Sequence, residues 1–245
     1  MLSNYLQRDA SGYLSQQQHQ TIPISPTGLM VYVNPTSYPG SGLTWSDLSG
    51  NGNNMTISGA TFSSNSFTFN GSSSYITTPN IYTLFTTSNS NFSQTQEVWF
   101  KSSNPGCIIS EQNATSSPSW YDSQLEMISS ITVKGRVWNQ LSPYSTISSA
   151  GPFTNWTYLA WRYNGATSTF DCFINGSLVS TSSVTRQFAP TPAAIYFVLG
   201  IGGVTNLGSG AYFNGQISVY RNYKVSLTNA QILSNYNADK AQFGY

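Results

Sequence analysis

Three polar residues in one short segment have the spacing of a calcium loop. Asp47, Ser49 and Asn51 recur at every second position, and Gly52 follows them. Side-chain oxygens followed by a glycine in this order match the first half of an EF-hand loop. The second half does not match, because Ser58 stands where an acidic ligand would close the site. A lone carboxylate binds calcium weakly, so this segment alone does not establish a metal site.

The same residues also predict a tight turn that needs no ion. Asn and Asp side chains form Asx-turns with nearby backbone N–H groups and tolerate a left-handed backbone. Gly50 and Gly52 in the same segment adopt positive φ angles without strain. We therefore favour a turn with no cofactor, and calcium held by Asp47, Ser49 and Asn51 is the alternative.

Two further segments have residues suited to a sugar-binding site. Trp120 and Tyr121 follow Pro118 in a predicted loop, and Arg136 and Trp138 lie at the next predicted turn. Exposed aromatic rings stack on the faces of sugars, while Asp, Asn and Arg side chains bond their hydroxyl groups. The alternative is that both tryptophans fill the core or cap its edge. These four aromatic and basic residues are the candidate sugar ligands.

Catalytic residues are sparse. A glycosidase needs two carboxylates about 5 to 9.5 Å apart, and Glu97 and Glu126, on separate predicted strands, form the only candidate pair. His19 is the only histidine and lies in a polar N-terminal segment. A Ser-His-Asp triad or a histidine metal cluster would have to recruit it. We predict that the chain is not an enzyme.

Composition excludes several classes of partner. Charged residues make up 7% of the 245 residues and the net charge is +1, which disfavours binding to nucleic acid. No apolar run approaches the roughly 18 residues of a membrane span, and the first residues lack the pattern of a secretory leader. Cys107 and Cys172 lie in predicted strand cores, which favours buried, reduced thiols over a disulfide.

From Gly28 onward the chain predicts an all-β sandwich. Short alternating or apolar segments are separated by Gly, Asn and Ser turns, with no helices between them, which is typical of antiparallel sheets. Trp99, Trp156 and Trp161 lie within these segments, and we assign them to the core. The predicted strands are 29–33, 66–70, 74–78, 96–102, 107–112, 124–133, 156–163, 169–175, 194–201 and 213–224.

One helix is predicted near the end of the chain, over residues 228–240. Thr228 and Gln231 form a capping box at its start, and Gly244 lies just past its end. Ile232, Leu233 and Tyr236 fall on one face, which we expect to dock on the sandwich.

Residues 1–27 differ from the rest of the chain. They are rich in glutamine, lack a sustained apolar pattern and end in a proline-bearing stretch. One interpretation is a disordered tail. The other is an arm that becomes ordered only against a partner, which would bury intermittent apolar side chains. These anchors are Tyr5, Leu6, Tyr13, Leu14 and Ile22.

Several stretches also resemble one known family. They are SYPGSGLTWSDLSGNGNN, FTFNGSSSYITTPN, QEVWFKS, NWTYLAWRYNG with FINGSLV, and FNGQISVYRNYKVSLTNAQILSNYNADKAQFG. Together they resemble laminin-G-like, concanavalin A-like domains over residues 28–245. The resemblance implies a jelly-roll sandwich of two antiparallel sheets with one short C-terminal helix. It also implies that the Asp47 segment is a connecting turn, with Trp45 packed beneath it.

The variant most similar to this chain occurs in virion proteins of phages and other viruses. The resemblance therefore implies a non-enzymatic virion protein, a component of a capsid decoration, tail or fibre that is anchored by its N-terminal arm. Its partners would be other virion proteins or copies of itself. The alternative is a carbohydrate-binding lectin or adhesin, extracellular or at a cell surface, that binds host glycans. A degenerate glycoside hydrolase is a third, weaker hypothesis.

Overall fold

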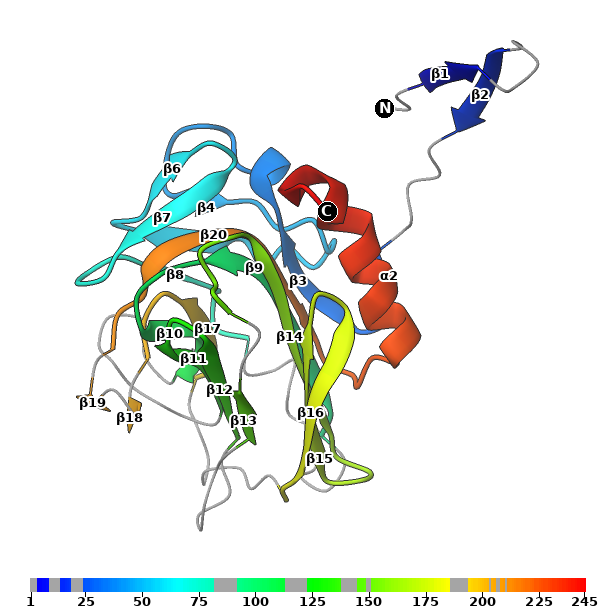
Figure 1. The fold of residues 1–245 in the computed structure, drawn as a ribbon. Helices are drawn as coiled ribbons and strands as arrows, with labels where there is room; N and C mark the ends of the chain where they lie inside the picture. The colour runs from blue at the N-terminus through cyan, green and yellow to red at the C-terminus, as the bar shows by residue number, and fades with distance from the viewer. Residues whose placement is uncertain are drawn as a thin grey trace.

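The structure is a computed structural model of the 245-residue chain. It describes residues 4–8, 14–18, 24–81, 92–112, 123–137, 145–148, 151–185, 194–202, 204–205, 208–209 and 211–245. Two antiparallel sheets pack face to face, and a C-terminal helix lies against the outer side of one of them (Figure 1). This arrangement confirms the predicted sandwich with one short helix. In the described part of the chain, no helix is long and apolar enough to cross a membrane.

The first sheet, here the β10 sheet, has the strand order β13-β12-β11-β10-β17-β8-β5-β4. Its strands are β4 (Thr44–Trp45), β5 (Met55–Ser58), β8 (Tyr75–Thr77), β10 (Gly106–Gln112), β11 (Ser123–Ser129), β12 (Thr132–Val137), β13 (Ser145–Ser148) and β17 (Tyr196–Leu199). The predicted single strand 124–133 was wrong, because β11 and β12 form a hairpin that turns at Ser130 and Ile131.

The second sheet, here the β9 sheet, has the order β16-β15-β14-β9-β20-β7-β6, and β3 also pairs with β20. Its strands are β3 (Leu29–Val33), β6 (Thr61–Ser63), β7 (Ser66–Asn70), β9 (Gln94–Lys101), β14 (Thr157–Asn164), β15 (Thr169–Ile174), β16 (Ser177–Ser183) and β20 (Asn214–Tyr223). The remaining elements are β1 (Asn4–Arg8), β2 (Leu14–Gln18), β18 (Val204–Thr205), β19 (Gly208–Ser209), and the helices η1 (Pro35–Ser37), α2 (Asn229–Asp239) and η2 (Lys240–Phe243).

Both faces of the β9 sheet are covered. Side chains alternate along a strand, so Val98 and Phe100 of β9 join the core between the sheets, while Trp99 packs in a second cluster beneath α2. Trp161 belongs to the core between the sheets, as predicted. Trp156, also predicted to be core, is only partly buried at the edge of the second cluster.

At the N-terminus, β1 and β2 form an antiparallel hairpin whose pairing runs from Asn4–Gln18 to Arg8–Leu14. Tyr5, Leu6 and Leu14 of the predicted arm lie in its strands, whereas Tyr13 and Ile22 lie outside the described residues. Both strands belong to a two-stranded sheet of their own. The role of these residues as partner-binding anchors stays a prediction.

Helix α2 begins as predicted. Thr228 Oγ1 accepts a hydrogen bond from Gln231 N, and Gln231 Oε1 accepts one from Thr228 N, which completes the capping box. Ile232 is buried and Tyr236 packs against the second cluster, as predicted, whereas Leu233 is 44% exposed and lies beside Gly176 at the turn between β15 and β16. The docked face also carries the buried polar residues Asn235 and Asp239, which bond to polar and charged side chains of the β9 sheet.

An ion network joins α2 to the β9 sheet. Arg221 Nη2 of β20 lies 2.7 Å from both carboxylate oxygens of Asp239, and Trp99 Nε1 donates to Asp239 Oδ2 at 3.1 Å. Glu97 Oε2 of β9 lies 3.4 Å from Arg221 Nη1. The Arg221 guanidinium also lies 4.6 Å from the ring centroid of Tyr32. Arg221 is fully buried, so these contacts replace hydration at its two terminal nitrogens, while its Nε has no hydrogen-bond partner among the described residues.

Asn235 extends this network to the beginning of the sandwich. Its Nδ2 donates to Glu97 Oε1 at 2.8 Å and to Tyr223 Oη at 2.9 Å. Its Oδ1 accepts a hydrogen bond from Ser25 N at 3.0 Å, and Gln231 Nε2 donates to Ser25 Oγ. The helix therefore fixes the chain just before β3, and Ser25, placed in the arm by the sequence, belongs structurally to the sandwich.

The Glu97 carboxyl is destabilised in its ionised form. Burial raises the pKa of Glu97 from its ordinary value of 4.5 to about 7, and the nearby Asp239 acts in the same direction. Arg221 and the hydrogen bonds from Asn235 and Tyr158 lower the pKa but do not offset burial. The Asp239 carboxylate already balances the positive charge of Arg221. An ionised Glu97 would therefore add a negative charge that no cation balances.

This shift predicts a pH-dependent stability. The folded chain retains a proton on Glu97 that the unfolded chain releases, so the resulting stabilisation is complete below pH 4.5 and is lost as pH rises through about 7. The expected loss in free energy of unfolding is on the order of 3 kcal/mol. In urea titrations from pH 4 to 8, Glu97→Gln should lack this loss. A difference between native protein and variant that does not change with pH would contradict the prediction.

Candidate functional site

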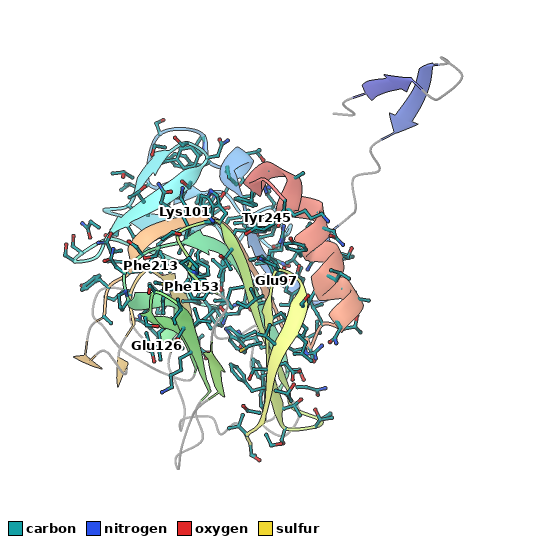
Figure 2. The ribbon with its side chains drawn as sticks, viewed as in Figure 1. Glu97, Lys101, Glu126, Phe153, Phe213 and Tyr245 are labelled. Carbon is teal, nitrogen blue, oxygen red and sulfur yellow. The ribbon has the colours of Figure 1, made fainter. Side chains whose placement is uncertain are left out.

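The candidate site is a cavity of about 380 Å³ at one end of the β9 sheet. Three chain segments meet there: the end of β9, the residues just before β14, and the residues that end and follow η2. Figure 2 shows Lys101 and Tyr245, from the first and last of these segments, at the same end of the sandwich. The lining residues are Lys101, Thr154, Asn155, Trp156, Phe243, Gly244 and Tyr245.

Strand register brings the first two segments together. Thr157 of β14 pairs with Phe100 of β9, so the next residues outward, Trp156 and Lys101, are neighbours at the sheet end. Lys101 Nζ lies 5.0 Å from the centroid of the Trp156 ring system, within the range of a cation–π contact. This contact fixes the amine over an aromatic face at the pocket wall.

Aromatic stacking places the third segment. The Phe243 ring stacks on Trp99 with centroids 4.0 Å apart, and lies 5.0 Å from Trp156. Gly244 then adopts a left-handed conformation at φ +86°, which a residue without Cβ accepts readily. The chain turns there, so Tyr245 Oη donates to the Trp156 carbonyl at 2.6 Å. Because Trp99 also bonds Asp239, the ion network holds this wall in place.

The lining combines aromatic faces with hydrogen-bonding groups. Trp156 is partly buried and Tyr245 is 50% exposed, while Thr154 and Asn155 are exposed beside them. None of the lining residues has a carboxylate side chain. Aromatic surface next to hydroxyl, amide and amine groups suits a ligand with one apolar face and a polar rim, as a sugar ring has. The lining has no pair of side-chain carboxylates of the kind that glycosidases use.

The sequence did not identify this pocket. Its pattern places Trp156 in the core and indicates no ligand role for Lys101, Phe243 or Tyr245. One local feature of the sequence indicates the pocket: Trp156 follows Asn155 just before the beginning of β14, where a side chain can face solvent. Recognising the site required the pairing of β9 with β14.

Of the four sugar ligands predicted from the sequence, one, Arg136, lies within the described residues. Trp120, Tyr121 and Trp138 are outside the described residues. Arg136 lies within β12, paired with Gln124, so its predicted position at a turn was wrong. The strand ends that flank 113–122 and 138–144 do lie together, since β10, β11 and β12 are neighbours and Ser123 pairs with Val137. Sugar binding by these four residues stays a prediction.

The Asp47 segment is built as a turn. Asp47 Oδ1 accepts hydrogen bonds from Tyr32 N and Ser49 N, each at 2.9 Å. Asp47 Oδ2 accepts from Ser49 Oγ at 2.7 Å and from Asn53 N at 2.9 Å. The Asn51 Nδ2 group donates to the Leu29 carbonyl at 2.9 Å. Four protein donors thus use the carboxylate that a metal would need.

Neighbouring residues complete this turn. Trp45, predicted to pack beneath this turn, is fully buried and donates from Nε1 to the Asn34 carbonyl at 2.8 Å. Gly50 and Gly52 have φ of +85° and +72°. No atom would crowd an added Cβ at either position, so backbone conformation accounts for these glycines. Among the described residues, no group of three His, Cys, Asp or Glu side chains could hold a metal ion.

A family comparison assigns the fold. The model of the concanavalin A-like lectin/glucanases superfamily matches residues 70–233, more than half of the chain. The chain belongs to this superfamily. No curated protein matches it.

Solved structures agree with this superfamily fold. The receptor-binding domain of botulinum neurotoxin C/D mosaic serotype is 14% identical with a TM-score of 0.63, covering 86% of this chain and 51% of that one. A Trypanosoma rangeli sialidase in complex with 2,3-difluorosialic acid is 14% identical with a TM-score of 0.62, covering 89% and 34%. Identity this low shows the fold alone. The chain spans about half the length of the neurotoxin chains it matches.

Glycosidases of this fold use paired carboxylates, and the candidate pair is separated here. Glu97 points away from the core toward α2. Glu126 of β11 lies between the core residues Leu125 and Met127, so it points out of the opposite sheet. Figure 2 shows the two carboxylates in different parts of the sandwich. They cannot flank one scissile bond.

The hydrogen bonds of Asp47 predict a calcium-independent role for this residue. Asp47→Asn should fold but lose about 1 kcal/mol, because its amide nitrogen cannot accept the bond from Asn53 N. The melting temperature of each protein should be the same in chelator and in calcium at millimolar concentration. A calcium-dependent rise for the native chain that is absent in the variant would restore the metal hypothesis.

Proposed function

We propose that this chain is a non-catalytic, lectin-like carbohydrate-binding module, and that the Lys101–Trp156–Tyr245 pocket is its sugar site. The observation that supports this most is the lining itself, in which two accessible aromatic rings meet hydroxyl, amide and amine groups. Sugar rings present C–H faces to aromatic rings and hydroxyl groups to polar neighbours. The cavity volume of about 380 Å³ is large enough for one or two sugar rings.

Structural neighbours lend this proposal weaker support. One binding domain of botulinum neurotoxin DC was solved in complex with SialylT, with a TM-score of 0.63 and 14% identity over 87% of this chain and 52% of that one. Entry of type C neurotoxin depends on two ganglioside molecules. These ligands are those of longer chains, and their binding residues are not transferred to this one.

A virion protein is the second candidate. The β1–β2 hairpin favours it, because both strands pair only with each other among the described elements. Such a hairpin leaves strand edges that another subunit could pair with. In this candidate the sandwich is displayed on a capsid, tail or fibre and the arm holds it there. The proposed sugar pocket is the same whether this chain is an extracellular lectin or a lectin displayed on a virion.

A glycan array tests the proposal. The labelled full chain should bind a selective set of glycans, and Trp156→Ala should weaken that binding about tenfold or more, because stacking is lost. Tyr75→Ala is the matched control, since Tyr75 is a partly buried aromatic residue of β8 in the other sheet. The control variant should retain binding.

Two results would contradict the carbohydrate-binding proposal. Undiminished binding by a folded Trp156→Ala variant would move the sugar site elsewhere. A folded native chain that binds no glycan on the array would reject the carbohydrate-binding function and favour the virion structural candidate.

A further inference from the structure

The pocket has an uneven charge. Lys101 has the only charged side chain among the lining residues. Ion pairs within the described residues join Arg162 to Asp171 and Arg221 to Glu97 and Asp239. None of them includes Lys101. Its amine therefore faces the cavity with an aromatic ring, rather than a carboxylate, as its neighbour.

A second side-chain amine lies near the pocket. Lys240 Nζ lies 5.6 Å from the ring centroid of Tyr236, and Tyr236 packs beside Tyr245 with centroids 6.2 Å apart. A second amine thus lies on the same aromatic cluster. Asp239, next to Lys240 in the chain, is buried and bonded to Arg221 and Trp99. Two side-chain amines, those of Lys101 and Lys240, thus lie near the pocket, and Asp239 pairs with neither of them.

A half-buried amine held in one position binds an anion better than a mobile surface lysine does. The cation–π contact with Trp156 restricts the Lys101 side chain before any ligand arrives, so less conformational entropy is lost on binding. The same contact holds the amine over the Trp156 ring, where a charged group of a sugar bound in the pocket would meet it. An anionic substituent of that sugar would meet the amine with no carboxylate side chain in the lining to repel it.

We propose that this pocket selects acidic saccharides, with a carboxylate or sulfate group at Lys101 Nζ and the sugar ring against Trp156 and Tyr245. This inference rests on the proposed carbohydrate-binding function. It names the class of glycan: sugars that carry a negative charge next to an apolar ring face.

Calorimetric titration of the full chain with three matched sugars tests the class. The probes are 3′-sialyllactose, 3′-sulfolactose and neutral lactose. At least one acidic probe should bind about tenfold more tightly than lactose, as expected for one charge-assisted contact. Lys101→Met should abolish that preference, and Lys101→Arg should retain most of it. Thermal unfolding of both variants should stay close to that of the native chain, since Lys101 is partly exposed.

The outcomes separate the two proposals. Equal binding of all three probes that Lys101→Met leaves unchanged would overturn the acidic-sugar inference but leave a sugar-binding pocket in place. An acidic preference that survives in Lys101→Met would assign the charge recognition to other residues and overturn the inference as well. The inference would also be overturned if the chain bound none of the three probes and bound only neutral sugars on the glycan array.

Discussion

The ion pair between Arg221 and Asp239 is the interaction on which the outer layer of this protein depends. It lies beneath α2, with the guanidinium fully buried and its Nη2 atom 2.7 Å from both carboxylate oxygens. Removing one member of such a buried pair leaves an uncompensated charge and costs about 3 to 5 kcal/mol. The helix therefore cannot leave the β9 sheet without a large loss of stability.

Two distant parts of the chain are positioned through this pair. Asp239 accepts a hydrogen bond from Trp99, and the Trp99 ring is the surface on which Phe243 stacks. Asn235, one helical turn earlier, bonds Ser25 at the start of the sandwich. The pocket wall formed by Phe243 and Tyr245 is thus fixed by contacts that lie outside the pocket. A short C-terminal segment can form part of a rigid binding site for this reason.

Local patterns were sufficient to predict most of the sandwich. Alternating and apolar segments marked the central strands, and Thr228 and Gln231 marked the start of α2, because these signals depend on residues close in sequence. A helical face inferred from hydrophobicity alone omitted Asn235 and Asp239, which are buried against the β9 sheet. The true docking face follows from Arg221 and Glu97, charged partners on distant strands. The hairpin at Ser130 and Ile131 was missed because it lacks the usual Gly or Asn turn residues.

The candidate site was less predictable than the fold, since its residues meet only through strand register and helix docking. The account is tested most directly by a crystal structure of the chain with bound sialyllactose or sulfolactose. It predicts a sugar ring against Trp156 and Tyr245, with the anionic group about 3 Å from Lys101 Nζ. Sugar bound among residues 113–122 and 138–144, with the pocket between Lys101 and Tyr245 unoccupied, would contradict it.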